Sequence, residues 1–216
     1  MQKGLQSSFE IWCWDRDEIE ESGHVGVKLK DTIYGFYPRK GEVVGGVFHP
    51  VDALGVVLVE SETDCADRYS DLYLEEIGII VALKGIIVVD KETNIIRSET
   101  IPIPSVHVFK IRVAKEVAEI LETYMKSLQE NVANGALLYN LSKNNCVTTT
   151  LECLQQANVL DVDNLKRTIR APSPSSLIRD LSTIKELKTG ELSGCRVLTL
   201  GVAGNHFGWI YDPMKN

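Results

Sequence analysis

The residues best suited to chemistry lie in an asparagine-rich segment that ends in a cysteine, Tyr139–Cys146 (YNLSKNNC). Asparagine is a favoured helix N-cap, so we predict a helix that begins near Asn144 or Asn145, with Cys146 in its first turn. The helix dipole and the unpaired N–H groups of that turn favour a thiolate, the nucleophilic form of cysteine. The segment therefore predicts Cys146 as a nucleophile. The structural alternative is a small apolar residue that anchors the helix.

A histidine that could act with this cysteine lies in Ser22–Val27 (SGHVGV), at the start of a predicted strand. The glycines on either side of His24 leave room for a substrate near the imidazole. An imidazole held against the sulfur would favour the thiolate and supply a proton to the leaving group. The alternative is an ordinary exposed strand residue. His49 and His107 lie beside apolar strand residues, and we expect both to be structural.

A rival pair has the opposite chain order, with Cys13 early in Trp12-Cys13-Trp14 and His206 late in Asn205-His206-Phe207-Gly208-Trp209. Cysteine first and histidine last is the order found in papain. Cys13 is predicted in the middle of a strand, where no helix dipole would activate its thiol. We therefore favour Cys146 over Cys13 as the nucleophile.

The elements that must position these residues are strands in the first half of the chain and helices in the second. Alternating and β-branched residues predict strands at 9–14, 24–29, 32–37, 55–60, 78–89, 106–112, 195–200 and 206–211. Apolar spacing and capping residues predict helices from 113 to about 134, from 144 or 145 to 157, and after Pro174. The acidic run 15–21 is expected to be a solvated turn or short helix, and the polar stretch 63–76 to be mobile or part of an insertion.

The composition of the chain argues against several classes of protein. The 216 residues are 44% hydrophobic and 25% charged, which is typical of a globular domain, and the net charge of −7 argues against a nucleic-acid surface. No apolar run is long enough to span a membrane, and the first residues lack a secretory signal. The five cysteines are irregularly spaced, without a CxxC pair, so we expect reduced thiols, no metal site and no cofactor.

The order of these motifs resembles a known family. A histidine in a GHVGV strand, an aromatic Tyr34–Pro38 (YGFYP) partner strand and a late asparagine–cysteine helix start resemble the circularly permuted papain-like cysteine hydrolases of the NlpC type. The resemblance covers roughly residues 12–38 and 139–155. It implies an α+β fold with a mainly antiparallel sheet packed against a few helices. We expect one domain over residues 1–216, with 61–105 as a candidate insertion.

By this resemblance Cys146 is the nucleophile and His24 the base, and Asn145, Tyr37 and His206 are further candidates for the substrate cleft or oxyanion hole. The residue that usually orients the histidine in this family has no evident counterpart here, because the neighbouring strand offers Thr32, Tyr34 and Tyr37. Either the pair acts as a dyad or the orienting residue comes from elsewhere.

Some members of the family resemble antibacterial effectors of type VI secretion that cleave peptide or amide bonds in peptidoglycan. The resemblance therefore implies a peptidoglycan or other peptide substrate, an immunity protein as partner, and export from the cytoplasm by a specialised machine. The same dyad would also serve a deamidase or an acyltransferase acting on a protein or lipid. Two non-enzymatic alternatives are a catalytically inactive papain-like binding domain and an interaction protein that acts through residues 63–104.

Overall fold

The computed structural model describes Gly4 and residues 6–14, 23–46, 49–77, 79–82, 85–89, 96–97, 105–160, 173–184, 186–203 and 206–211. Within these ranges, side chains are described except in 70–97 and 201–207. The acidic run 15–21, for which a turn or short helix is predicted, lies outside the described residues.

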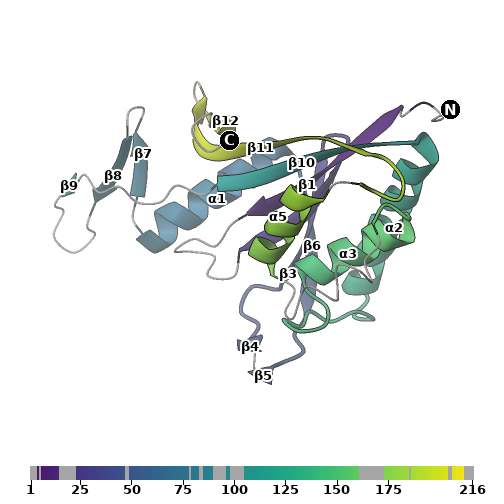
Figure 1. Cartoon of the computed structure of the whole chain (residues 1–216). Helices are drawn as coiled ribbons and strands as arrows, with labels where there is room; N and C mark the ends of the chain where they lie inside the picture. Colours follow the sequence, from purple (N-terminus) through teal and green to yellow (C-terminus); the bar gives the residue numbers. More distant parts are fainter. Residues whose placement is uncertain are drawn as a thin grey trace.

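The centre of the fold is a seven-stranded antiparallel sheet with the strand order β12-β11-β10-β1-β2-β3-β6 (Figure 1). Its strands are β1 (Ser7–Trp14), β2 (His24–Leu29), β3 (Thr32–Pro38), β6 (Gly55–Glu60), β10 (Ser105–Val113), β11 (Glu191–Ala203) and β12 (His206–Tyr211). The strand that carries His24 therefore lies between β1 and β3, close to the middle of the sheet. This arrangement confirms the predicted α+β class and the antiparallel sheet.

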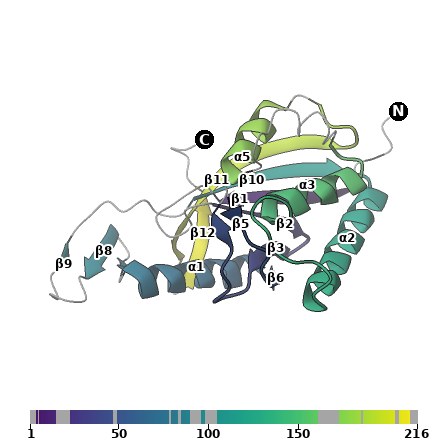
Figure 2. The same cartoon turned by 90° about the horizontal axis from the view of Figure 1, so that it is seen from below.

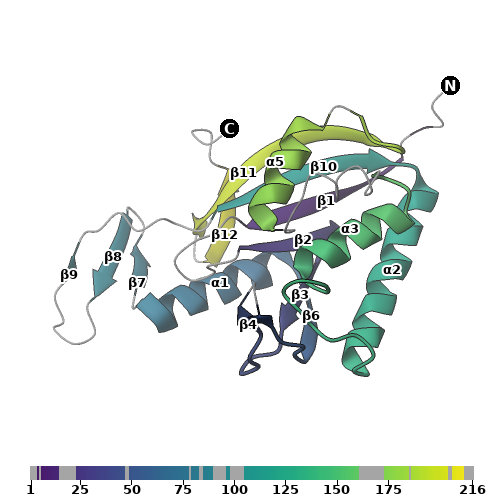
Figure 3. The ribbon, with the colours of Figure 1, turned by 60° about the horizontal axis from the view of Figure 1, so that its bottom comes forward.

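Helices lie on both sides of this sheet (Figures 2 and 3). They are α1 (Glu62–Ile77), α2 (Lys115–Ala133), α3 (Cys146–Gln156) and α5 (Pro174–Thr183). Two small sheets complete the described elements, formed by β4 (Gly45–Gly46) with β5 (His49–Pro50), and by β7 (Ile79–Ala82), β8 (Gly85–Val89) and β9 (Ile96–Arg97). The helix predicted to begin near Asn145 thus begins at Cys146, with Asn145 as its N-cap.

Each face of the sheet packs into its own apolar cluster. On one face, Phe9, Ile11 and Cys13 of β1 pack with residues of α2, α3 and α5. On the other face, Trp12 and Trp14 of the same strand pack with residues of α1. Successive strand residues point to opposite faces, so β1 contributes to both clusters in alternation. We call these two sides the α3 face and the α1 face.

The helix α1 corrects the prediction for residues 63–76, which were expected to be mobile or inserted. Ser61 and Asp64 exchange hydrogen bonds at its first turn, and Cys65, Ala66 and Tyr69 are buried against the sheet. The apolar face of the helix is short and contains no long aliphatic residue in its first two turns, so its helical period is weak in the sequence. Packing against the sheet therefore stabilises this helix more than its intrinsic helix propensity does.

The candidate insertion at 61–105 contains both this helix and the small sheet β7–β9. Figure 1 shows β7–β9 beyond the end of α1, and β7 contacts both α1 and β11 of the seven-stranded sheet. The helix itself contacts β3, β6, β11 and β12, so the first part of this region belongs to the main core. No helix among the described residues has the length and apolarity needed to cross a membrane.

The orientation of α2 gives a test of this fold. Leu121 is fully buried on the α3 face, whereas its neighbour Ile120 is 45% exposed. Leu121→Ala is expected to lower the free energy of unfolding by about 2–5 kcal/mol, because it removes buried methyl groups and leaves a cavity. Ile120→Ala should cost less than about 1 kcal/mol. Urea denaturation measures both, and equal losses would contradict the orientation of α2.

Candidate functional site

The turn before Cys146 is held in place by the side chain of Asn140. Its Oδ1 accepts hydrogen bonds from the backbone N–H of Ser142 at 2.9 Å and of Lys143 at 3.2 Å, and from the Ser142 hydroxyl. Its Nδ2 donates to a carboxylate oxygen of Asp52 at 2.6 Å. Asn140 is 3% exposed. One buried amide therefore ties the turn to itself and to the loop that precedes β6.

The start of α3 is fixed by Asn145 in the same manner. Its Oδ1 accepts from the backbone N–H of Val147 at 2.9 Å and of Thr148 at 3.0 Å, and the hydroxyl of Thr148 accepts from the Asn145 N–H at 2.8 Å. Its Nδ2 donates to the carbonyl of Leu141 at 2.7 Å. This reciprocal capping box satisfies two of the first helix donors. Asn145 thus positions the helix start.

Cys146 is the first residue of α3 and lies on the α3 face, where it is 6% exposed. The helix packs across β2 and β3. Cys13 of β1 belongs to the same apolar cluster, and its pKa is raised well above its ordinary value, first by burial and then by the charges that Cys146 and Cys195 would carry as thiolates. The thiol thus occupies the predicted position at a helix start, over the middle of the sheet.

His24 lies on the opposite face of the sheet from Cys146. Its neighbour Val25 packs in the cluster that contains Cys146, and strand alternation turns His24 the other way. The imidazole stacks on the ring of Tyr37, with centroids 3.6 Å apart, and lies 5.7 Å from the ring of Trp14. A Cβ at Gly35 would fall 2.9 Å from its Nε2, so this packing needs glycine at 35.

Tyr37 also lies on the α1 face, where it connects His24 to α1. Its hydroxyl accepts a hydrogen bond from Arg68 at 2.9 Å, and the Arg68 guanidinium lies 4.9 Å from the centre of its ring. Glu60 binds the same guanidinium through both carboxylate oxygens, at 2.7 and 3.1 Å. The structure therefore brings Tyr37 together with His24, and both lie away from Cys146.

The surroundings of His24 keep its imidazole neutral. The residue is 4% exposed, and its pKa is lowered well below the ordinary value by burial and then by the positive charge of Arg68. Its Nε2 and the indole nitrogens of Trp14 and Trp209 are buried, and none of them has a hydrogen-bond partner among the described residues. The rings of Trp14, Tyr69 and Trp209 pack against one another with centroids 5.6–6.1 Å apart. This environment disfavours an imidazolium ion.

The members of the rival pair lie on different strands. Cys13 is fully buried in the middle of the sheet, and its raised pKa favours the neutral thiol. His206 begins the edge strand β12, opposite Ala203, and β11 and β10 lie between that strand and β1. The side chain of His206 lies outside the described side chains. As the sequence predicts, Cys13 itself lies within a strand, β1, and not in a helix.

Two residues were not assigned to the site from the sequence: Arg68 was not considered, and His107 was expected to be structural. Arg68 lies in the polar stretch whose helix was missed, so nothing in the sequence placed it beside Tyr37. His107 lies directly opposite Cys13 in the pairing of β1 with β10. It shares its strand face with Phe109 and Ile111, which pack in the cluster of Cys146. Strand alternation was visible in the sequence, but it did not reveal which face α3 would cover.

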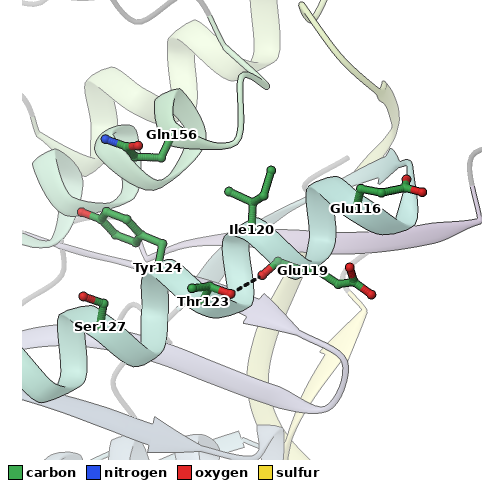
Figure 4. A pocket seen from close by; sticks show the side chains of 7 residues that line it. All are labelled: Glu116, Glu119, Ile120, Thr123, Tyr124, Ser127 and Gln156. Atoms are coloured by element: carbon green, nitrogen blue, oxygen red, sulfur yellow. Dashed lines mark hydrogen bonds between the residues drawn. The ribbon is translucent and has the colours of Figure 1, made fainter.

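A shallow pocket of about 560 Å³ lies elsewhere, on the outer side of α2 (Figure 4). In Figure 4, Ile120 and Tyr124 of α2 lie on the flank that faces Gln156 of α3. The Tyr124 hydroxyl donates to Glu152, and burial raises the pKa of this phenol. The lining includes no cysteine or histidine, so this pocket is separate from the predicted site.

Among the described residues, no group of three or more histidine, cysteine, aspartate or glutamate side chains is arranged to hold a metal ion.

The cap of α3 gives a second test. Asn145→Ala removes the acceptor of two backbone N–H groups and is expected to lower the free energy of unfolding by about 1–2 kcal/mol. Asn145→Ser retains a capping oxygen and should recover most of this loss. Urea denaturation of both variants is the measurement. Equal losses would show that the side chain does not act as the cap.

Burial of His24 gives a third test, on pH dependence. In the unfolded chain His24 binds a proton near pH 6.5, but in the folded protein its lowered pKa keeps it neutral. Because the unfolded state then binds more protons, the free energy of unfolding should fall as pH drops from 7 to 5. The slope from this one group is up to roughly 1 kcal/mol per pH unit. His24→Phe keeps an aromatic ring against Tyr37 and should flatten the profile. Identical profiles for the two proteins would contradict a buried neutral His24.

No family model matches the chain, and comparisons with curated proteins and with solved structures found no match.

Proposed function

We propose that the protein is a cysteine hydrolase of papain-like, permuted NlpC-type architecture, in which Cys146 attacks the carbonyl of a peptide or amide bond. The observation that carries this proposal is the position of Cys146 at the first residue of α3. Two buried asparagine side chains hold that position. Peptidoglycan peptides are the proposed substrate class, on the resemblance of the sequence motifs.

The start of a helix favours the chemistry that such an enzyme needs. The positive end of the α3 dipole stabilises a thiolate at its first residue. The thiolate would attack the carbonyl carbon, expel the amine and leave an acyl-enzyme, which water would then hydrolyse. Cys13, Cys153 and Cys195 all have pKa values raised by burial, so these thiols are protonated at neutral pH. Cys146 is thus the described cysteine whose helix position best suits a nucleophile.

A binding domain without catalysis is the second candidate, and one specific observation favours it. His24, the base implied by the family resemblance, lies on the α1 face and is buried among aromatic rings. It does not contact Cys146 in this arrangement. A protein that used the region around Cys146 only to bind a peptide would need neither a base nor an acidic thiol.

Thiol reactivity separates these two functions without a known substrate. We would treat the intact protein with trace iodoacetamide from pH 5 to 9 and map each cysteine by peptide mass spectrometry. A hydrolase predicts that Cys146 is half-labelled at least about one pH unit below 8.5, the ordinary value for a thiol. The exposed Cys195 serves as the internal comparison. An ordinary profile for Cys146 would contradict the hydrolase and favour the binding domain.

Activity is the second readout of the same prediction. Purified peptidoglycan fragments incubated with the protein should yield shortened stem peptides, detected by mass spectrometry. Cys146→Ala should lower this rate at least about a thousandfold, because the nucleophile is lost. Cys195→Ser, which changes an exposed thiol on β11 opposite Phe109, should retain it.

A further inference from the structure

The sheet places a different histidine on the side of the nucleophile. In the pairing of β1 with β10, His107 lies directly opposite Cys13. Residues opposite each other on antiparallel strands share a face, with Cα atoms about 4.5–5.5 Å apart. On the same strand, Phe109 and Ile111 belong to the α3-face cluster, whereas Val106 and Val108 belong to the α1-face cluster. His107 therefore points to the α3 face.

Cys146 lies close to the same point of the sheet. A negative charge on the Cys146 thiolate would raise the pKa of Cys13, after the larger effect of burial, so the two groups lie within electrostatic range of each other. Cys146 also packs in one cluster with Cys13 and Val25, which are direct partners in the pairing of β1 with β2. Cys13 thus connects the two residues: His107 is its direct partner on β10, and Cys146 shares its apolar cluster from α3, which packs on the neighbouring strand β2.

A general base must exchange protons with solvent, and His107 and His24 differ in their exposure to water. His107 is only partly buried, so its imidazole has access to water and can exchange protons with solvent. His24 is 4% exposed and faces the aromatic rings of the α1 face. Of the three histidines whose side chains are described, His107 alone faces α3 from the seven-stranded sheet.

We propose that His107, and not His24, is the general base that acts with Cys146. The inference rests on the proposed hydrolase. His107 would take the proton of the Cys146 thiol to form a thiolate–imidazolium pair; the thiolate would bond to the substrate carbonyl carbon, and the imidazolium would give that proton to the amine as the C–N bond breaks. Water would next attack the thioester, with His107 taking its proton, and the C–S bond would break to release the acid. Return of that proton to sulfur restores the starting enzyme.

Other titratable groups on this face, among the described side chains, include the phenols of Tyr34, Tyr124 and Tyr139 and the thiol of Cys153. Cys13 from β1 and Cys195 from β11 lie on the same side of the sheet, and burial raises the pKa of both thiols. The helix α5 packs on β1 and carries Asp180, whose Oδ1 is bound to Arg179 and whose Oδ2 is buried without a partner. Among side chains, an imidazole is the one whose ordinary pKa lies near neutrality, as a general base requires.

The test compares matched histidine variants in the intact protein. Iodoacetamide labelling of Cys146 from pH 5 to 9 is measured for wild type, His107→Gln, His24→Phe and His49→Gln, the last being an exposed histidine outside the seven-stranded sheet. With His107→Gln, the labelling profile should move up by about one pH unit or more, so labelling at pH 6 falls about tenfold. The other two variants should match the wild type.

A second measurement does not depend on a histidine variant that folds. NMR titration measures the pKa of the His107 imidazole in wild type and in Cys146→Ala, and so tests the same Cys146–His107 pair through the histidine. Loss of a neighbouring thiolate should lower the pKa of His107, because an opposite charge favours the imidazolium.

The outcomes separate the two proposals. A Cys146 profile that is shifted in wild type and unchanged in a folded His107→Gln overturns the assignment of His107 but leaves the hydrolase standing. A shift seen with His24→Phe alone would return the role to His24. An unchanged His107 titration in Cys146→Ala also overturns the assignment. An ordinary Cys146 profile in wild type contradicts the hydrolase itself, and the assignment of His107 with it.

Discussion

Burial of both faces of the central strands is the constraint on which the rest of this structure depends. In β1, Phe9, Ile11 and Cys13 pack beneath α2, α3 and α5, while Trp12 and Trp14 pack against α1. Neither set can change sides without exposing large apolar side chains to water, so the register of the strand is strongly specified. The same alternation extends through the pairing to β2 and β10. Adjacent residues on β2 or β10 therefore point to opposite faces of the sheet and contact different helices.

That alternation has a direct chemical consequence. His24 and Val25 are adjacent in sequence, yet Val25 lies under the helix that carries Cys146 and His24 lies among the aromatic rings of the α1 face. On β10, His107 has the parity that Val25 has on β2, and so it shares the face of Cys146. The α1 face instead provides an environment that favours a neutral imidazole. The stacked ring of Tyr37 helps to bury His24, and the positive charge of Arg68 opposes its protonation.

The position of Cys146 depends on a separate and more local interaction. Asn140 and Asn145 each use both ends of the side-chain amide, one to close the turn onto Asp52 and the other to cap α3 and hold the Leu141 carbonyl. Buried amides are costly unless they are hydrogen-bonded, and here the bonds also fix where the helix begins. The thiol is thus held by short-range bonds, and the sheet beneath it determines which groups it faces.

What the sequence determined by itself follows this division between local and long-range interactions. The strands β2 and β3, the start of α3 and the cap at Asn145 depend on residues within a few positions of one another, and these were predicted close to their observed bounds. The predicted strands at 78–89 and 195–200 are instead the pair β7 and β8 and the longer strand β11. The helix α1 was missed, because its apolar face is too short to be recognised before it packs on the sheet. The pairing of β1 with β10 joins segments about a hundred residues apart, and the side of the sheet that α3 covers is set by packing of the whole core. Only the tertiary structure could therefore decide which histidine shares a face with Cys146, because no local pattern records the face on which a distant helix will pack.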